Sequence, residues 1–173
     1  MAIDDPCVLI RFMRPPNSNR ATANALAGTS TPAEVWPIII FHPDSIRYHD
    51  CYCHIPEIYD GGGFTVQYWW SSAAGAGDVI WSGAFRALPD DAEDLTAAHT
   101  YAYNDAAAAT TAGTVGEVVK TAFTFDDGSD SDGVQAGEIC LFRIRRFASD
   151  SGDTLDGNAY LHRVSIRMTG AVA

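Results

Sequence analysis

The fold is decided by two stretches near the C-terminus, EICLFRIRRF at residues 138–147 and NAYLHRVSIRM at residues 158–168. Apolar or aromatic side chains recur at every second position in both, which is the pattern of a half-buried β-strand. The segment between them, residues 148–157, is rich in Ser, Asp and Gly, a composition typical of a β-turn or loop. We therefore predict that the two strands form a long β-hairpin.

One face of the first strand is apolar along its length, whereas the other turns basic. Cys140, Phe142 and Ile144 occupy the apolar face, and we expect this face to pack in the core. The opposite face ends in Arg143 and Arg145. We expect Arg145 to be an exposed charge whose truncation to alanine changes stability by no more than about 1 kcal/mol.

Turn-forming residues separate six further segments with strand-like patterns. We predict strands at Val8–Phe12, Ile38–Phe41, Ile46–His54, Phe64–Ser71, Asp78–Leu88 and Val115–Phe125. The fourth and fifth flank a turn of small residues and are expected to form a central hairpin, while Pro89–Ala98 is expected to form one short helix. About eight strands without a long helix predict an all-β fold, an antiparallel two-sheet sandwich of the jelly-roll type.

A chain of 173 residues is expected to form a single domain, here residues 1–173. Residues 13–35 are expected to be a long loop or arm, because Pro15–Pro32 has almost no large apolar side chain to fix it to a core. We predict that this arm becomes ordered against a partner or a neighbouring subunit.

The chain carries a formal net charge of -11. Nucleic acid is therefore not expected as a partner, because binding to phosphates depends on clustered Lys and Arg. No apolar run approaches the ~20 residues of a membrane-spanning helix, so no membrane partner is expected. The first six residues are acidic and lack the cationic start of a secretory signal, which favours a protein made in the cytoplasm and kept there or exported by another route.

No motif predicts a catalytic centre, a cofactor site or a metal site. Thiols and imidazoles, the usual zinc ligands, lie close in the sequence at Cys51, Cys53, His42, His49 and His54. In a strand, however, the two cysteines lie on one face and His54 on the other, which does not favour a zinc site. We therefore expect Cys7, Cys51, Cys53 and Cys140 to be reduced core residues. The acidic loops are interpreted as solvated turns rather than calcium sites; they contain Asp126, Asp127, Asp130, Asp132, Asp150, Asp153 and Asp156. A glycosidase-like acid and base could come only from one polar run, Asp90, Asp91, Glu93 and Asp94, and spacing alone gives this hypothesis little support.

Four aromatic residues offer a surface on which sugar rings could stack: Tyr68, Trp69, Trp70 and Trp81. Alternation places Trp69 and Trp70 on opposite faces of their strand, so at most one of them lies in the core. The outward one either binds a ligand or lies in a contact between subunits. We favour the subunit contact and take Trp69 as its residue.

Residues 59–88 and 137–168 resemble a group of small β proteins encoded in tailed-phage genomes. The shared features are the Gly61-Gly62-Gly63 turn, the aromatic strand after it, a GDVIW-like strand at residues 77–81, the segment AGEICLFRIRR at residues 136–146 and DTLDGNA at residues 153–159. The resemblance covers residues 36–168. It implies a jelly-roll virion component, either a capsid decoration protein or part of a tail or adhesion structure.

Together these observations predict a non-enzymatic phage virion protein that acts as a capsid decoration, or cement, protein on the capsid exterior. It is expected to form homo-oligomers, as trimers, and to bind the major capsid protein. The interface candidates are Trp69, Arg143, Arg145, Pro15, Pro16 and Asn17. The alternative is a glycan-binding module of a tail fibre or adhesion device that uses an exposed tryptophan.

Overall fold

The computed structural model describes residues 9–169, which contain twelve β-strands and one short 3₁₀ helix. The strands are β1 (Leu9–Arg14), β2 (Thr22–Ala27), β3 (Val35–Phe41), β4 (Tyr48–His54), β5 (Phe64–Ser72), β6 (Asp78–Val79), β7 (Trp81–Leu88), β8 (Asn104–Asp105), β9 (Ala109–Thr110), β10 (Val119–Phe125), β11 (Ile139–Arg146) and β12 (Ala159–Met168), and the helix is η1 (Gly128–Ser131). The part of the chain that the structure describes holds no helix long and apolar enough to cross a bilayer.

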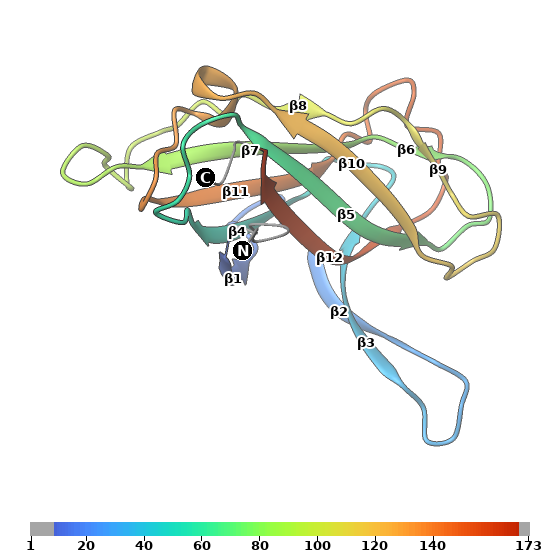
Figure 1. Ribbon diagram of the computed structural model, residues 1–173. Coiled ribbons are helices and arrows are strands. Elements are labelled where there is room, and N and C mark those ends of the chain that lie inside the picture. Colours follow the sequence, from blue (N-terminus) through green and yellow to red (C-terminus); the bar gives the residue numbers. More distant parts are fainter. Residues whose placement is uncertain (1–8, 170–173) are drawn as a thin grey trace.

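Two five-stranded antiparallel sheets form the sandwich (Figure 1). One, the β4 sheet, has the order β1-β4-β11-β7-β8; the other, the β5 sheet, has the order β10-β5-β12-β3-β2. The predicted all-β jelly-roll sandwich is confirmed. All eight predicted strands occur, and the four others are β2 and three strands of two residues each.

An aromatic cluster between the sheets forms part of the core. Trp81 of the β4 sheet packs edge-on against Phe41, Tyr68 and Trp70 of the β5 sheet, with ring centroids 5.1, 5.4 and 5.9 Å apart. All four of these side chains are fully buried. Such edge-to-face contacts add to the free energy gained by burying the rings, and they fix how the two sheets face each other.

Both predicted hairpins are wrong, although their strands are right. β5 belongs to one sheet and β7 to the other, and the same holds for β12 and β11. β11 pairs with β4 and β7, whereas β12 pairs with β3 and β5. Each connection therefore carries the chain from one sheet to the other, and alternation with turn residues cannot distinguish such a crossing from a hairpin.

One local prediction fails, and a second is right only in part. Pro89–Ala98 forms turns instead of a helix, because Asp91 has a left-handed φ of +55° and the Asp94 side chain accepts hydrogen bonds from the backbone and hydroxyl of Thr96. The predicted loop or arm at residues 13–35 contains β2, whose backbone pairs with β3 in an unbroken register from Thr22↔Ile40 to Ala27↔Val35. Residues with small side chains, which bury little apolar surface, can still form a strand through main-chain hydrogen bonds.

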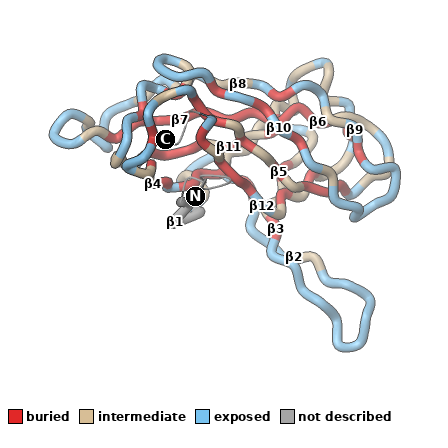
Figure 2. Tube along the Cα trace, viewed as in Figure 1, coloured by how far each residue is buried: buried red, intermediate tan, exposed pale blue. Residues whose placement is uncertain are grey.

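The β2–β3 hairpin does extend as an arm. It leaves the sandwich as a long projection (Figure 1), and almost its whole length is exposed (Figure 2). Val35 and Trp36 retain 63% and 57% of their accessible surface.

Candidate functional site

Two pockets lie on the outer face of the β4 sheet, and we call the strip of surface that holds them the groove. Strand pairing places Ile139 opposite His54, Leu141 opposite Tyr52, and Arg143 opposite Asp50, all on the side that faces away from the core. Residues 89–103 run back over the same face from the end of β7, and β8 then pairs with the start of β7. This segment covers the β7 side of the sheet and leaves Tyr52 on β4 exposed, at 40% of its surface.

Arginines fasten the covering segment to the sheet. Arg86 on β7 binds Glu93 with its Nη2 and Oε1 atoms 2.5 Å apart. The guanidinium of Arg143 lies 4.2 Å from the ring centre of Tyr101, and that of Arg145 lies 3.7 Å from the ring centre of Tyr103. Cation–π contacts of this kind hold planar cations against tyrosine faces. The covering segment is therefore one fixed wall of the groove.

The basic end of the groove is a pocket of about 410 Å³. It is lined by Arg14, Pro15, Pro16, Asn17, Arg20, Asp50 and Tyr52. Arg14 and Arg20 are exposed, and neither forms an ion pair with another described residue. This end thus presents an aromatic ring beside amide, carboxylate and guanidinium groups, each of which can form hydrogen bonds with a polar ligand.

Asp50 is the floor of this pocket and is held by a forked ion pair. Arg143 donates from Nε and Nη2 to the two carboxylate oxygens of Asp50, at 2.7 and 2.8 Å. Burial opposes the charge on Arg143, but the hydrogen bonds to Asp50 and the attraction of its charge outweigh burial and raise the pKa of Arg143 above its ordinary value. The pair holds the carboxylate of Asp50 at a fixed position, as a preformed acceptor needs to be.

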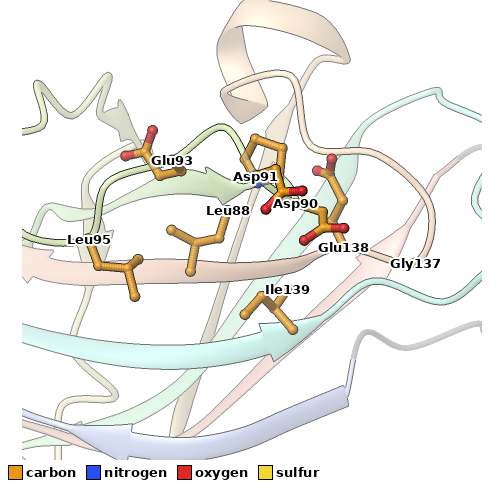
Figure 3. Close-up of a pocket in the computed structure, with 9 residues that line it drawn as sticks. Leu88, Asp90, Asp91, Glu93, Leu95, Gly137, Glu138 and Ile139 are labelled. Carbon is orange, nitrogen blue, oxygen red and sulfur yellow. The ribbon is translucent and has the colours of Figure 1, made fainter.

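The acidic end of the groove is a second pocket, of about 380 Å³ (Figure 3). Leu88, Leu95 and Ile139 form its aliphatic part, and acidic side chains surround them: Asp90, Asp91, Glu93 and Glu138. Glu93 is engaged by Arg86, and Glu138 accepts the backbone N–H of Gln135 at 2.9 Å. Asp90, Asp91 and Glu93 of the acidic run thus line a pocket. The ion pair of Glu93 with Arg86 holds the covering segment, residues 89–103, on the sheet.

Five of the six interface candidates lie on this face. Pro15, Pro16 and Asn17 line the basic pocket, Arg143 holds its floor, and Arg145 lies farther along β11. Trp69 is elsewhere, on the outward face of the β5 sheet, with the Arg163 guanidinium 5.2 Å from its ring centre. The prediction that Trp69 and Trp70 face opposite sides is confirmed, because Trp70 is fully buried.

Arg145 is not the exposed charge that the sequence pattern predicts. Its side chain retains 14% of its surface, between the rings of Tyr103 and Phe147, and its Nη2 lies 3.4 Å from Asp105. Alternation along the strand predicts that Arg145 points away from the core. It cannot predict that residues 89–103, which are distant in the sequence, cover this side chain. Truncation of Arg145 therefore removes packing as well as charge.

The cysteines and acidic loops have structural roles. Cys51, Cys53 and Cys140 are buried in the core with free thiols, whereas Cys7 lies outside the described residues. Asp127 accepts a hydrogen bond from Tyr59, and Asp153 pairs with the buried Arg146. Within residues 9–169, no group of three or more His, Cys, Asp or Glu side chains is arranged to hold a metal ion.

Two exposed aromatic residues were missed by sequence reasoning. Tyr52 lies in a strand where neither face is cleanly apolar, and Trp36 lies in the apolar run before Ile38. Trp36 borders a cleft of about 370 Å³ between the hairpin and the body. A tryptophan next to Pro37 was the available signal, because Pro disfavours a strand paired on both sides, and residue 37 lies in the part of β3 that pairs with β2 alone.

No protein-family model and no curated protein matches the chain. Solved structures do resemble it. One is a tandem pair of CBM22 domains from Paenibacillus barcinonensis, with a TM-score of 0.50 and 14% identity over 95% of this chain, which spans about half (51%) of the tandem. The CBM22-2 xylan-binding domain from the same organism gives a TM-score of 0.49 and 14% identity, with 91% of each chain covered.

A domain of the bacteriophage CBA120 tailspike protein 4 is a weaker match. Its TM-score is 0.43 at 8% identity, over 90% of this chain and 19% of the tailspike chain. The tandem domain supports the jelly-roll fold, since identity this low speaks for the fold alone.

Proposed function

We propose that this protein is a non-catalytic glycan-binding module whose ligand lies in the groove on the β4 sheet. The observation that carries the proposal is the pocket of about 410 Å³ in which the exposed Tyr52 ring stands beside Asp50, Asn17, Arg14 and Arg20. A sugar ring presents an apolar face to an aromatic side chain and hydroxyls to planar polar groups. The pocket offers both kinds of partner on one rigid sheet.

Two features support this assignment. The fold is shared with carbohydrate-binding modules, a class of non-catalytic domains. Asp50 is preorganised by Arg143, so a ligand hydroxyl that donates to it does not have to order the carboxylate first.

The test is binding of the purified protein to a panel of soluble neutral and acidic polysaccharides, followed by titration calorimetry with the oligosaccharide that binds best. Tyr52→Ala should weaken binding about tenfold or more, which corresponds to about 1.4 kcal/mol. Tyr160→Ala is the matched control, since this partly buried tyrosine lies on the other sheet and should bind as the unchanged protein does. Absence of binding to every polysaccharide, or equal affinity of the two variants, contradicts the proposal.

The place of such a module in a virion stays a prediction. Two locations are predicted, and each depends on the sequence resemblance alone. One is a tail fibre or adhesion device, and the other is the capsid, as a decoration protein bound to the major capsid protein. Quantified gel bands from purified particles distinguish them, because a decoration protein is present in far more copies than a tail component.

A further inference from the structure

The projecting hairpin is longer than the sheet that supports it. β3 pairs with β12 only at Ile39, Ile40 and Phe41, and this pairing ends at Leu161, where the register of β12 with β5 shifts. The β2–β3 ladder continues outward through four more pairs, from Asn24↔Ile38 to Ala27↔Val35. These outer pairs form a two-stranded ribbon without a third strand, an arrangement that is marginally stable in water when nothing packs on it.

The free edge of this ribbon is β2, the last strand of the β5 sheet. Natural edge strands are protected by charges, proline or bulges that prevent another strand from pairing. The β2 sequence, TANALA, has no charge and no proline, and its register with β3 runs without a shift. Its edge is therefore open to a further strand.

The main-chain groups of Ala25 show how this edge is satisfied at present. Ala25 lies opposite Pro37, which has no N–H, and the N–H of Ala25 donates to the side-chain Oδ1 of Asn24 at 2.8 Å. A neighbouring side chain thus occupies an N–H that the ladder with β3 does not use. A carbonyl from an added strand can replace that local bond without disturbing the hairpin.

The distribution of charge indicates which strand can pair with the open edge of β2. The whole chain carries a net charge of -11, so most of its surface repels a second copy. Residues 21–41 contain one charged residue, Glu34, together with the exposed apolar side chains Val35 and Trp36. The hairpin is therefore a surface on which two copies can meet with little repulsion and with apolar area to bury.

We propose that β2 pairs antiparallel with the β2 strand of a second copy across a two-fold axis, which joins the two β5 sheets into one continuous sheet. A two-fold contact is self-complementary, since each copy supplies the same edge and the same exposed hairpin. Main-chain hydrogen bonds provide the pairing, as in β-strand addition to an open edge.

The test is sedimentation velocity of the full chain over a range of concentrations up to about 100 μM, a range in which interfaces of micromolar affinity saturate. The unchanged protein should sediment as a dimer at high concentration, and Ala25→Lys should remain monomeric. Ala107→Lys is the matched control, since it makes the same charge change at an exposed loop position and should dimerise. Circular dichroism should be the same for all three proteins.

Hydrogen exchange of the unchanged protein supplies a second measurement that needs no variant. The backbone amides of residues 22–27 that do not bond to β3, such as that of Ala25, should exchange at least tenfold more slowly at high than at low concentration, because pairing removes them from water. A protein that stays monomeric, a trimer, a dimer that Ala25→Lys does not dissociate, or exchange in β2 that is independent of concentration overturns the proposal.

Discussion

Phe142 is the side chain through which the packing of the core can be measured most directly. It is fully buried, and its ring lies 4.8 Å from that of Phe85 and 5.8 Å from that of Phe125. Phe142→Ala should lower the free energy of unfolding by about 3–5 kcal/mol, because the surrounding sheets close the cavity only in part. Urea denaturation checks this, with Ile139→Ala as the control.

Ile139 lies on the same strand as Phe142, but it faces outward and is 53% exposed. Its truncation should change stability by about 1 kcal/mol or less. Equal urea midpoints for the two variants would show that the facing of β11 is wrong.

His49 should make stability depend on pH. Its side chain is buried, and both ring nitrogens lack a hydrogen-bond partner among the described residues. Burial lowers the pKa of His49 below its ordinary value of 6.5, an effect that the neighbouring Asp50 partly opposes. In the unfolded chain His49 binds a proton near pH 6.5, whereas in the folded protein it binds one only at lower pH. The free energy of unfolding therefore falls as the pH drops below 6.5.

The measurement is the unfolding free energy at pH 7.5 and 5.5 for the unchanged protein and for His49→Gln. The variant should lose less stability over this interval, because it lacks the group that titrates. His54→Gln, on the outward face of the same strand, is the control and should retain the full loss. His162, whose pKa burial also lowers, contributes with the same sign in all three proteins.

At the scale of the element, the turn before β5 depends on Gly63. Its φ is +81°, and a Cβ at this position would lie 2.0 Å from the carbonyl oxygen of Phe125 at the end of β10. Gly113 has nearly the same φ, +86°, but a Cβ there would meet nothing within 4 Å. Comparing alanine substitutions at the two glycines therefore distinguishes the cost of a left-handed φ from the cost of a steric clash.

Gly113→Ala should cost about 1–2 kcal/mol, the usual penalty of a left-handed conformation. Gly63→Ala should cost at least about 2 kcal/mol more, since β5 or β10 has to move to relieve the contact. Thermal melting of the two variants checks the difference. A smaller loss at Gly63 than at Gly113 would contradict the close approach of these strands.

The sequence predicts individual strands well and their neighbours poorly. Cys140, Phe142 and Ile144 are core residues because period-two alternation reports which side of one strand is buried. Alternation carries no information about the sheet in which that strand lies, so it cannot show that β11 and β12 belong to different sheets. The groove could not be predicted, because it exists only where residues 89–103 fold back over Arg143 and Arg145.

At the scale of the whole molecule, charge should make stability depend on salt. The chain has 22 acidic and 11 basic residues, so like charges repel in the compact state more than in the unfolded chain. Raising sodium chloride from 20 to 300 mM should stabilise the protein by about 1 kcal/mol, or roughly 2–4 °C in melting temperature. A melting temperature that falls with salt would show that the ion pairs at Arg86, Arg143 and Arg146 outweigh the repulsion.

The crossing of the chain between sheets has a consequence for synthesis on the ribosome. β11 lies between β4 and β7, and β12 lies between β5 and β3, so the last two strands of residues 9–169 are central strands of the two sheets. Neither sheet can close until residues 139–168 have left the exit tunnel. Until then the apolar faces of the earlier strands are bare, and closing the sheets then takes the slow timescale of non-local pairing, milliseconds to seconds.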